Sequence, residues 1–158
     1  MRSLDATDAR LLLALSDNPR ATGLELAQRL GLSRNTVQAR LTGLESRPAL
    51  HAFDTRVQPQ ALGYPLTAFI TTQVDQHRLA EVAPGLEAVP EVIEVHGLTG
   101  GADLLVRVVA RDSDDLFRVA ELVLGAPGVE RTSIALSMRE MVPYRVAPLL
   151  NRLVQGEG

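Results

Sequence analysis

The sequence contains no cysteine, no tryptophan and no lysine, and aromatic side chains make up only 3% of its 158 residues. Without cysteine, the chain can form neither a disulfide framework nor a thiolate metal site, which fits a reducing interior. It also lacks any run of the roughly 20 apolar residues that a membrane span requires. The apolar run near the N-terminus, Leu11 to Leu15, is five residues long and too short for a signal peptide. We therefore expect a soluble, cytoplasmic protein.

Positive charge is also scarce. The formal net charge is −3, which argues against a nonspecific binder of polyanions. The two halves of the chain differ, however, because residues 1–64 hold eight arginines and six acidic residues, whereas residues 65–158 hold eight arginines and thirteen acidic residues. A surface that faces an anion is therefore expected in the first half, and two copies of it in a dimer would strengthen the attraction.

The stretch from Leu24 to Leu44 has the pattern of two helices joined by a tight turn. In its first part, apolar residues recur every three positions at Leu24, Ala27 and Leu30, as on one face of a helix. Gly31 follows and can adopt the left-handed conformation that ends a helix. Ser33 is then a candidate N-cap for the second helix. The pattern predicts a helix-turn-helix.

The second helix of this pair has a polar face that suits DNA. Asn35, Gln38, Ala39 and Thr42 project away from an apolar stripe of Val37, Leu41 and Leu44, with Arg34, Thr36 and Arg40 on its flanks. Asn and Gln can bond adenine, Arg can bond guanine or phosphate, and a small Ala can contact a thymine methyl group. The alternative is an ordinary helical hairpin with a solvated polar face. The candidate DNA-binding residues are Ser33, Arg34, Asn35, Thr36, Gln38, Ala39, Arg40 and Thr42.

A further helix precedes this pair, and a linker follows it. The cap-type residues Asp5 and Thr7 and the apolar positions that follow predict a helix that ends around Ser16 to Pro19, completing a three-helix domain over residues 1–49. Residues 50–64 are assigned to a linker. Alternating apolar residues from Leu50 to Val57 indicate a short extended segment in it, and Pro59 to Gly63 indicates a turn.

The second half of the sequence changes period. Strands are expected at 66–74, 92–98, 104–110 and 130–138, and amphipathic helices at 79–86 and 116–124. This order is the βαββαβ arrangement of ferredoxin-like domains, in which two helices cover one face of a four-stranded sheet. We assign residues 65–142 to this domain and 143–158 to a C-terminal tail. Only that tail is left to cover the other face, so a second copy packing sheet to sheet is the economical solution, and we predict a homodimer.

Other classes of function find little support. The three histidines, His51, His77 and His96, lie on different predicted elements without metal-ligand spacing or a nearby pair of carboxylates. His96 and Asp103 flank one turn, but a polar histidine on one face of a strand is more often structural. We therefore expect neither an enzyme nor a metal or cofactor site. A metabolite-sensing or oligomerisation module whose helical half contacts protein in place of DNA is the remaining alternative.

Several segments taken together resemble the Lrp/AsnC, or feast/famine, family of transcription regulators. They are LDATDARLLLAL at the start, ELAQRLGLSRNTVQARLTGLE in the hairpin, QPQALG in the linker, EVIEVHGLTGGADLLVRV in the sheet and PGVERTSIALS near the end. The resemblance implies an α+β protein with an N-terminal helix-turn-helix domain, winged or plain, followed by a βαββαβ effector domain, often called the RAM domain. It also implies a dimer that assembles further into a tetramer or octamer, a palindromic operator in double-stranded DNA, and a response to an amino acid or related small molecule.

The same resemblance implies an effector site at the turn between the second and third strands, at the contact between dimers. Glycine N–H groups there can hold a carboxylate, and Asp103 can pair with an ammonium group. The family turn usually reads Gly-Asp-aromatic-Asp-Tyr, from which this chain departs at Gly101, Ala102 and Leu104. A hairpin chosen for its turn geometry alone is the alternative. The candidate effector residues are Leu98, Thr99, Gly100, Gly101, Ala102, Asp103 and Leu104, with Thr132, Ser133 and Ile134 of the last strand supplied by a neighbouring subunit.

Overall fold

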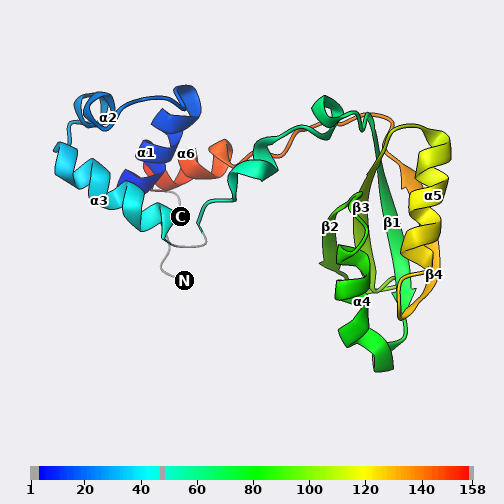
Figure 1. The fold of residues 1–158 in the computed structure, drawn as a ribbon. Coiled ribbons are helices and arrows are strands. Elements are labelled where there is room, and N and C mark those ends of the chain that lie inside the picture. The colour runs from blue at the N-terminus through cyan, green and yellow to red at the C-terminus, as the bar shows by residue number, and fades with distance from the viewer. Residues whose placement is uncertain (1–3, 47–48, 157–158) are drawn as a thin grey trace. The chain divides into compact units, whose positions relative to one another are not determined.

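The computed structural model describes residues 4–46 and 49–156 and divides the chain into two compact units (Figure 1). Residues 1–52 and 142–158 form the first, which we call the helical unit, and residues 53–141 form the second, the sheet unit. The chain therefore leaves the helical unit once and returns to it. No helix in the described ranges is long and apolar enough to cross a lipid bilayer.

The helical unit contains the three predicted helices, each with a local start signal. Asp5 and Thr22 form capping boxes with Asp8 and Glu25, respectively, and Ser33 accepts a hydrogen bond from the backbone N–H of Thr36. Gly31 ends the second helix at a φ of 66°, in the left-handed region that favours glycine. The helices are α1 (Ala6–Asp17), α2 (Gly23–Leu30) and α3 (Arg34–Glu45).

The core of this unit corrects one detail of the predicted pattern. Leu26 and Ala27 are the buried residues of α2, whereas Leu24 is 54% exposed. At 100° per residue, Leu24 lies about 110° from the middle of the face that Leu26, Ala27 and Leu30 share, beyond its edge, so it was wrongly assigned to the buried side. The buried core residues are Leu11, Ala14, Leu26, Ala27, Val37 and Leu44.

The predicted C-terminal tail contains a fourth helix of the helical unit. This is α6 (Ala147–Gln155), which begins with a proline in its first turn, ends at Gly156 with a φ of 78°, and packs against α1 (Figure 1). Leu150 is buried in α6, whereas its neighbour Leu149 is 64% exposed. The tail therefore belongs to the helical unit and is not a cover for the sheet.

The sheet unit confirms the predicted α+β fold. Its four strands are antiparallel and lie in the order β2-β3-β1-β4, the topology of a ferredoxin-like domain. The linker before it differs from the prediction in its first part, because Phe53–Arg56 is a 3₁₀ turn and not part of an extended segment, whereas the turn expected at Pro59 to Gly63 is present as a 3₁₀ turn at Pro59–Leu62. An extended segment needs a pairing strand, which the described single chain does not supply there. The elements are β1 (Leu66–Val74), α4 (Leu79–Glu87), β2 (Val92–Gly97), β3 (Leu104–Ala110), α5 (Ser113–Leu124) and β4 (Val129–Leu136).

Both helices of the sheet unit pack on one face of the sheet. Ile70 of β1 and Val106 of β3 are fully buried beneath Leu86 of α4 and Val123 of α5. The opposite face, which we call the open face, carries Thr67, Phe69 and Thr71 of β1 and Leu105, Arg107 and Val109 of β3, in register across the two strands. Neither helix of the sheet unit covers it, although Val109 at one end of the face is only 4% exposed.

Candidate nucleic-acid interface and effector site

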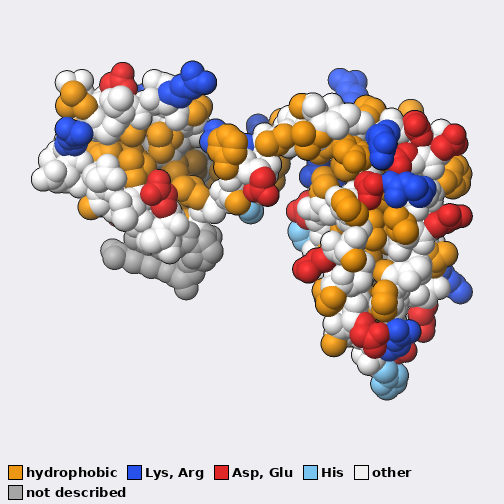
Figure 2. All heavy atoms as spheres, in the orientation of Figure 1, with side chains coloured by type: hydrophobic (Ala, Val, Ile, Leu, Met, Phe, Trp, Pro, Cys, Tyr) orange, Lys and Arg blue, Asp and Glu red, His pale blue; other side chains and the backbone are white. Residues whose placement is uncertain are grey.

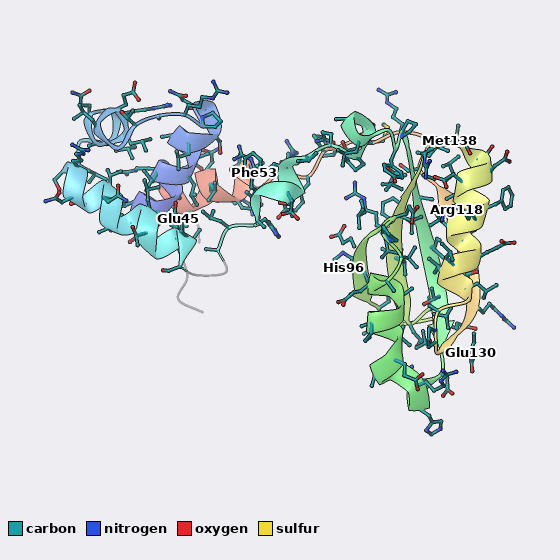
Figure 3. The ribbon with its side chains drawn as sticks, viewed as in Figure 1. Glu45, Phe53, His96, Arg118, Glu130 and Met138 are labelled. Carbon is teal, nitrogen blue, oxygen red and sulfur yellow. The ribbon has the colours of Figure 1, made fainter. Side chains whose placement is uncertain are left out.

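The outward face of α3 is where the sequence places it. Arg34, Asn35, Gln38, Ala39 and Thr42 are all exposed, because Val37 and Leu44 are buried on the other side of the helix. Figure 3 shows side chains standing out from α3 along its length, as far as Glu45 at its end. This surface offers guanidinium, amide and hydroxyl groups to a partner, the donors and acceptors that read base edges and phosphates.

Ser33 and Thr36 lie at the start of α3 and bond to each other. The Ser33 hydroxyl accepts from the Thr36 N–H at 3.1 Å, and the two hydroxyl oxygens are 2.8 Å apart. Both residues are exposed at an N-terminal helix end, where N–H groups and the helix dipole attract phosphate. Ser33 and Thr36 therefore cap the N-terminus of α3, and both remain exposed as part of the candidate DNA-binding surface.

Arg40 does not share the outward orientation. Its Nη1 lies 2.8 and 2.7 Å from the two carboxylate oxygens of Asp5 and 2.8 Å from Oδ1 of Asp8, and both acids belong to the start of α1. Asp8 is buried. The hydrogen bond from Arg40 lowers the pKa of Asp5, and the same contact raises the pKa of Arg40. The sequence pattern grouped Arg40 with the DNA-binding residues, whereas the structure places it against α1.

The turn between β2 and β3 is tied to the end of β1. The Asp103 carboxylate accepts from the Val74 N–H at 2.9 Å through Oδ2 and from Gln76 Nε2 at 3.3 Å through Oδ1. The Gln73 side-chain amide donates to the Gly101 carbonyl at 3.2 Å. Gly100 has a φ of 127°, which favours glycine, and Leu98 to Gly101 are exposed. Asp103 therefore shapes the turn, and its Oδ1 holds the longer and weaker of the two carboxylate contacts.

The three β4 residues predicted for this site lie elsewhere in the single chain. Thr132 pairs with Thr72 of β1, which in turn pairs with Leu104 of β3, so β1 separates Thr132 from the turn. Ser133 faces the open side of the sheet, and Ile134 is 42% exposed on the edge strand. Within one chain these residues and the turn do not meet, so a shared site requires the second subunit that the prediction invoked.

His96 does not pair with the acid across its turn. His96 lies on β2 (Figure 3), and its Nε2 is 2.8 Å from Oε1 of Glu94, so its partner is not Asp103 across the turn. Among the described residues, no group of three His, Cys, Asp or Glu side chains is arranged to hold a metal ion. His96 and Glu94 therefore form an exposed polar contact along one strand.

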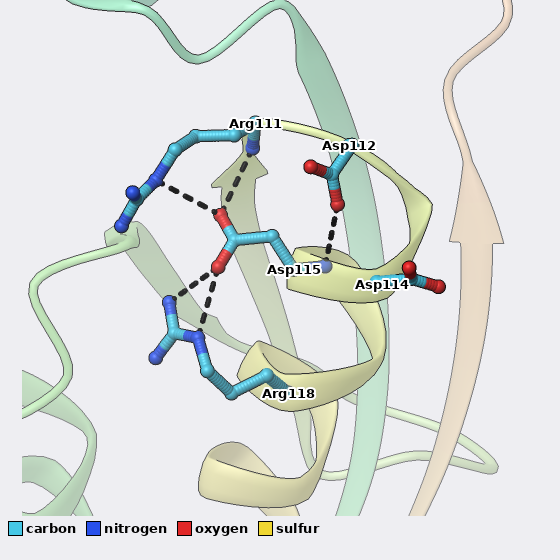
Figure 4. Close-up of a pocket in the computed structure, with 5 residues that line it drawn as sticks. All are labelled: Arg111, Asp112, Asp114, Asp115 and Arg118. Carbon is cyan, nitrogen blue, oxygen red and sulfur yellow. Dashed lines mark hydrogen bonds and ion pairs between the residues drawn. The ribbon is translucent and has the colours of Figure 1, made fainter.

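The sequence pattern gave no sign of a charged hollow at the start of α5, lined by Arg111, Asp112, Asp114, Asp115 and Arg118 (Figure 4). The Asp115 carboxylate accepts from the Arg111 N–H at 3.0 Å and from Arg118 Nε at 2.9 Å, and Asp112 caps α5. The bonds from Arg111 and Arg118 lower the pKa of Asp115. Arg118 also bonds the buried Glu91, which precedes β2.

The two arginines pair with only two of the four acids, Arg111 and Arg118 with Asp115 and Arg118 also with Glu91, and Figure 2 shows red and blue side chains side by side over the start of α5. The contacts of Asp115 with Arg111 and of Arg118 with Glu91 therefore connect α5 to the end of β3 and to the loop before β2. Nothing in the local sequence pairs Glu91 with Arg118, because the two residues are 27 positions apart.

Comparison with known proteins covers both units. Residues 4–45 match the family model of the AsnC-type helix-turn-helix domain, and residues 67–147 match that of the Lrp/AsnC ligand binding domain. The HTH-type transcriptional regulator LrpA of Mycobacterium tuberculosis is 38% identical over 120 residues, which are 73% of this chain and 80% of LrpA. FL11 of Pyrococcus horikoshii, also an HTH-type transcriptional regulator, is 30% identical over 136 residues, covering 86% of this chain and 90% of FL11.

A solved structure extends this similarity to the fold. The feast or famine regulatory protein from M. tuberculosis, complexed with L-methionine, superposes with a TM-score of 0.79 at 29% identity. The match covers 90% of this chain and 97% of that one. Both the order and the arrangement of the elements are therefore shared over nearly the whole length.

Proposed function

The chain belongs to the Lrp/AsnC family of transcriptional regulators, as its sequence indicated, and from that premise we propose which of its surfaces read DNA, form the dimer and sense an effector. Residues 1–49 act as the DNA-binding domain, 50–64 as the linker and 65–142 as the effector domain, and α6 supports the DNA-binding domain. The regulator works in the cytoplasm and needs neither a catalytic step nor a cofactor.

The DNA-reading surface is the outward face of α3. The observation that carries this proposal is that Arg34, Asn35, Gln38, Ala39 and Thr42 are exposed together, while Val37 and Leu44 anchor the helix from the other side. Such a face can enter a major groove, with its N-terminal residues nearest the bases. The hydroxyls of Ser33 and Thr36 and the helix N-terminus then face the backbone phosphates.

The dimer forms through the open face of the sheet. Phe69 and Leu105, which are both partly exposed, give this face an apolar centre, which a second copy would bury by packing sheet to sheet. A two-fold dimer presents two copies of α3 and so predicts a palindromic operator with half-sites about 34–36 Å apart. Further assembly of such dimers into a tetramer or octamer brings the β2–β3 turns to the contacts between dimers.

The effector is an amino acid bound at the turn from Leu98 to Leu104. The exposed N–H groups around Gly100 and Gly101 suit its carboxylate, and Oδ1 of Asp103, held by Gln76 at only 3.3 Å, suits its ammonium group. The β4 segment of a neighbouring subunit, from Thr132 to Ile134, completes the pocket. The L-methionine complex of the related regulator supports this class of ligand. A ligand that prefers one assembly shifts the population toward it and so alters DNA binding.

The decisive test is a mobility-shift titration of the purified protein on the DNA upstream of its own gene, at two salt concentrations and with a panel of amino acids. A specific, salt-sensitive shift that one amino acid alters supports the DNA-reading and the effector proposals together. A specific shift that no amino acid alters retains the DNA reader and leaves the turn as a structural hairpin. If no specific, salt-sensitive shift is seen, the helical unit is a protein-contacting module.

A further inference from the structure

Arg40 is the one basic residue of α3 that the structure turns away from the outward face. It follows Val37 by three residues and so lies about 60° around the helix from that buried side chain, on the side that faces α1. Its side chain is 30% exposed, and its Nη1 contacts both oxygens of Asp5 and one oxygen of Asp8. The guanidinium charge is thus shared between two carboxylates of α1.

This contact is costly to break. The Asp8 side chain is only 9% exposed, so withdrawal of Arg40 would leave its charge desolvated and unpaired. Asp5 is occupied as well, because its Oδ1 caps α1 by accepting from the N–H groups of Thr7 and Asp8 at 2.8 and 2.9 Å. One carboxylate therefore both starts α1 and holds α3.

We propose that Arg40 is a positioning residue that never touches DNA: bound to Asp5 and Asp8, it fixes the rotation of α3 so that Arg34, Asn35 and Gln38 point outward. The role rests on the proposed DNA-reading face. Burial of Val37 and Leu44 alone allows α3 to roll by some degrees, and a reading helix must be held within roughly 10–20° of its productive orientation. The charged contact to a second helix removes that freedom.

The test separates positioning from a phosphate contact through the salt dependence of DNA affinity. The probe is a fluorescein-labelled duplex that the wild-type protein has selected from a random-sequence pool, and anisotropy titrations at several salt concentrations give the slope of log K against log salt. The variant is Arg40→Gln, and the matched control is Arg34→Gln, because Arg34 is exposed on the same helix and makes no ion pair with a described residue. Circular dichroism establishes that each variant is folded at the temperature used.

Arg40→Gln is expected to bind at least about fivefold more weakly with an unchanged salt slope. Arg34→Gln is expected to lower the slope by about 0.9 for each phosphate that the arginine neutralises in the wild-type protein. The positioning role is overturned if Arg40→Gln lowers the slope as Arg34→Gln does, or if the folded Arg40→Gln variant binds with wild-type affinity. If the wild-type protein selects no duplex, the proposed DNA-reading face itself is overturned. A lower salt slope for Arg40→Gln overturns only the positioning role and leaves the DNA-reading face in place.

A second variant keeps the proposal testable if Arg40→Gln fails to fold. Asparagine caps helices about as well as aspartate, so Asp5→Asn keeps the start of α1 while removing one of the two charges that hold Arg40. Nonspecific electrostatics predicts tighter DNA binding when an acid is removed, whereas positioning predicts weaker binding. The control is Glu45→Gln, an exposed acid on α3 itself, which is expected to bind no more weakly than wild type. Binding by Asp5→Asn that is tighter than that of the wild type would overturn the positioning role.

Discussion

The carboxylate of Asp103 accepts a hydrogen bond from the backbone N–H of Val74 at 2.9 Å, which joins the β2–β3 turn to the end of β1. Val74 is buried, and its N–H loses this acceptor if the carboxylate is removed. The same side chain is the one expected to meet the ammonium group of an effector. The structural contact to Val74 uses Oδ2, whereas the proposed contact to an effector uses Oδ1, so the two are separable by substitution.

Asp103→Ala is expected to lower the free energy of unfolding by about 1–3 kcal/mol, because the Val74 N–H is left without an acceptor. Asp103→Asn is expected to retain the stability of the sheet unit but to lose the response to amino acids, since its single oxygen serves Val74 and its amide then faces the ligand ammonium. Urea denaturation measures the first effect, and a DNA mobility shift with and without the amino acid measures the second. Gln76→Ala, which removes only the weaker contact to Oδ1, is the control. An unaltered amino-acid response in Asp103→Asn would exclude Asp103 from the ligand contacts.

Sequence alone sufficed for features whose signal is local. The Gly31 helix end and the Ser33 cap follow from neighbouring residues, and the alternation in β1 separates the face of Ile70 from that of Phe69. The ion-pair partners of the charged residues could not be predicted from local sequence. Arg40 and Asp5 are 35 positions apart, and their contact depends on how α3 crosses α1, which no spacing rule describes.

Two further differences come from elements whose structure depends on a partner. α6 has only nine residues, too few to be stable by helix propensity alone, and packing against α1 supports it. The segment from Leu50 to Val57 alternates like a strand, but a strand requires another strand beside it, and in the single described chain the segment forms a 3₁₀ turn at Phe53–Arg56. The effector residues of β4 are a similar case, because their predicted site involves two subunits.

The contribution of α6 to the helical unit is testable with a matched pair of leucines. Leu150→Ala is expected to destabilise this unit by about 2–3 kcal/mol, because Leu150 is only 8% exposed where α6 joins the unit. Leu149→Ala, one position earlier and 64% exposed, is expected to change stability by less than about 0.5 kcal/mol. Thermal unfolding followed by circular dichroism compares the two variants. Equal effects would mean that α6 does not pack through Leu150.

The close approach of the loop before β4 to α4 depends on Gly128. Its φ of 83° is already strained for any side chain, and a Cβ there would lie 2.8 Å from Cγ2 of Val82. Gly128→Ala is therefore expected to incur about 1–2 kcal/mol for the left-handed backbone and about 1–3 kcal/mol more for the overlap. Gly63→Ala is the control, since Gly63 has a φ of 88° with open space around it and is expected to show the backbone cost alone. Chemical denaturation measures both, and equal losses of stability would contradict the overlap.

Asp115 contributes to the way the free energy of unfolding changes at acidic pH. Its pKa is lowered from the ordinary value of 3.8 by bonds from Arg111 and Arg118, so the folded protein binds this proton less readily than the unfolded chain. The contribution is fully present above about pH 4 and is lost as the pH falls through the lowered pKa. Asp115→Asn is expected to show a smaller loss of unfolding free energy between about pH 5 and pH 2 than wild type. The control is Asp114→Asn, on the same exposed turn of α5, and an identical acid profile in the two variants would contradict the assignment.

The open face of the sheet provides the clearest test of assembly. Phe69 lies on that face, paired across the sheet with Arg107 and Ala135, whereas Phe117 is 70% exposed on α5, which packs on the other face. A two-fold interface contains each side chain twice, so Phe69→Ser removes two aromatic groups from its apolar centre and is expected to weaken dimerisation by about 100-fold. Phe117→Ser removes an equally large side chain from a surface outside the proposed interface and is expected to leave the dimer intact. Sedimentation equilibrium measures both dissociation constants. If Phe117→Ser disrupts the dimer and Phe69→Ser does not, the interface lies on the helices of the sheet unit. The spacing of the two α3 copies would then follow from that contact.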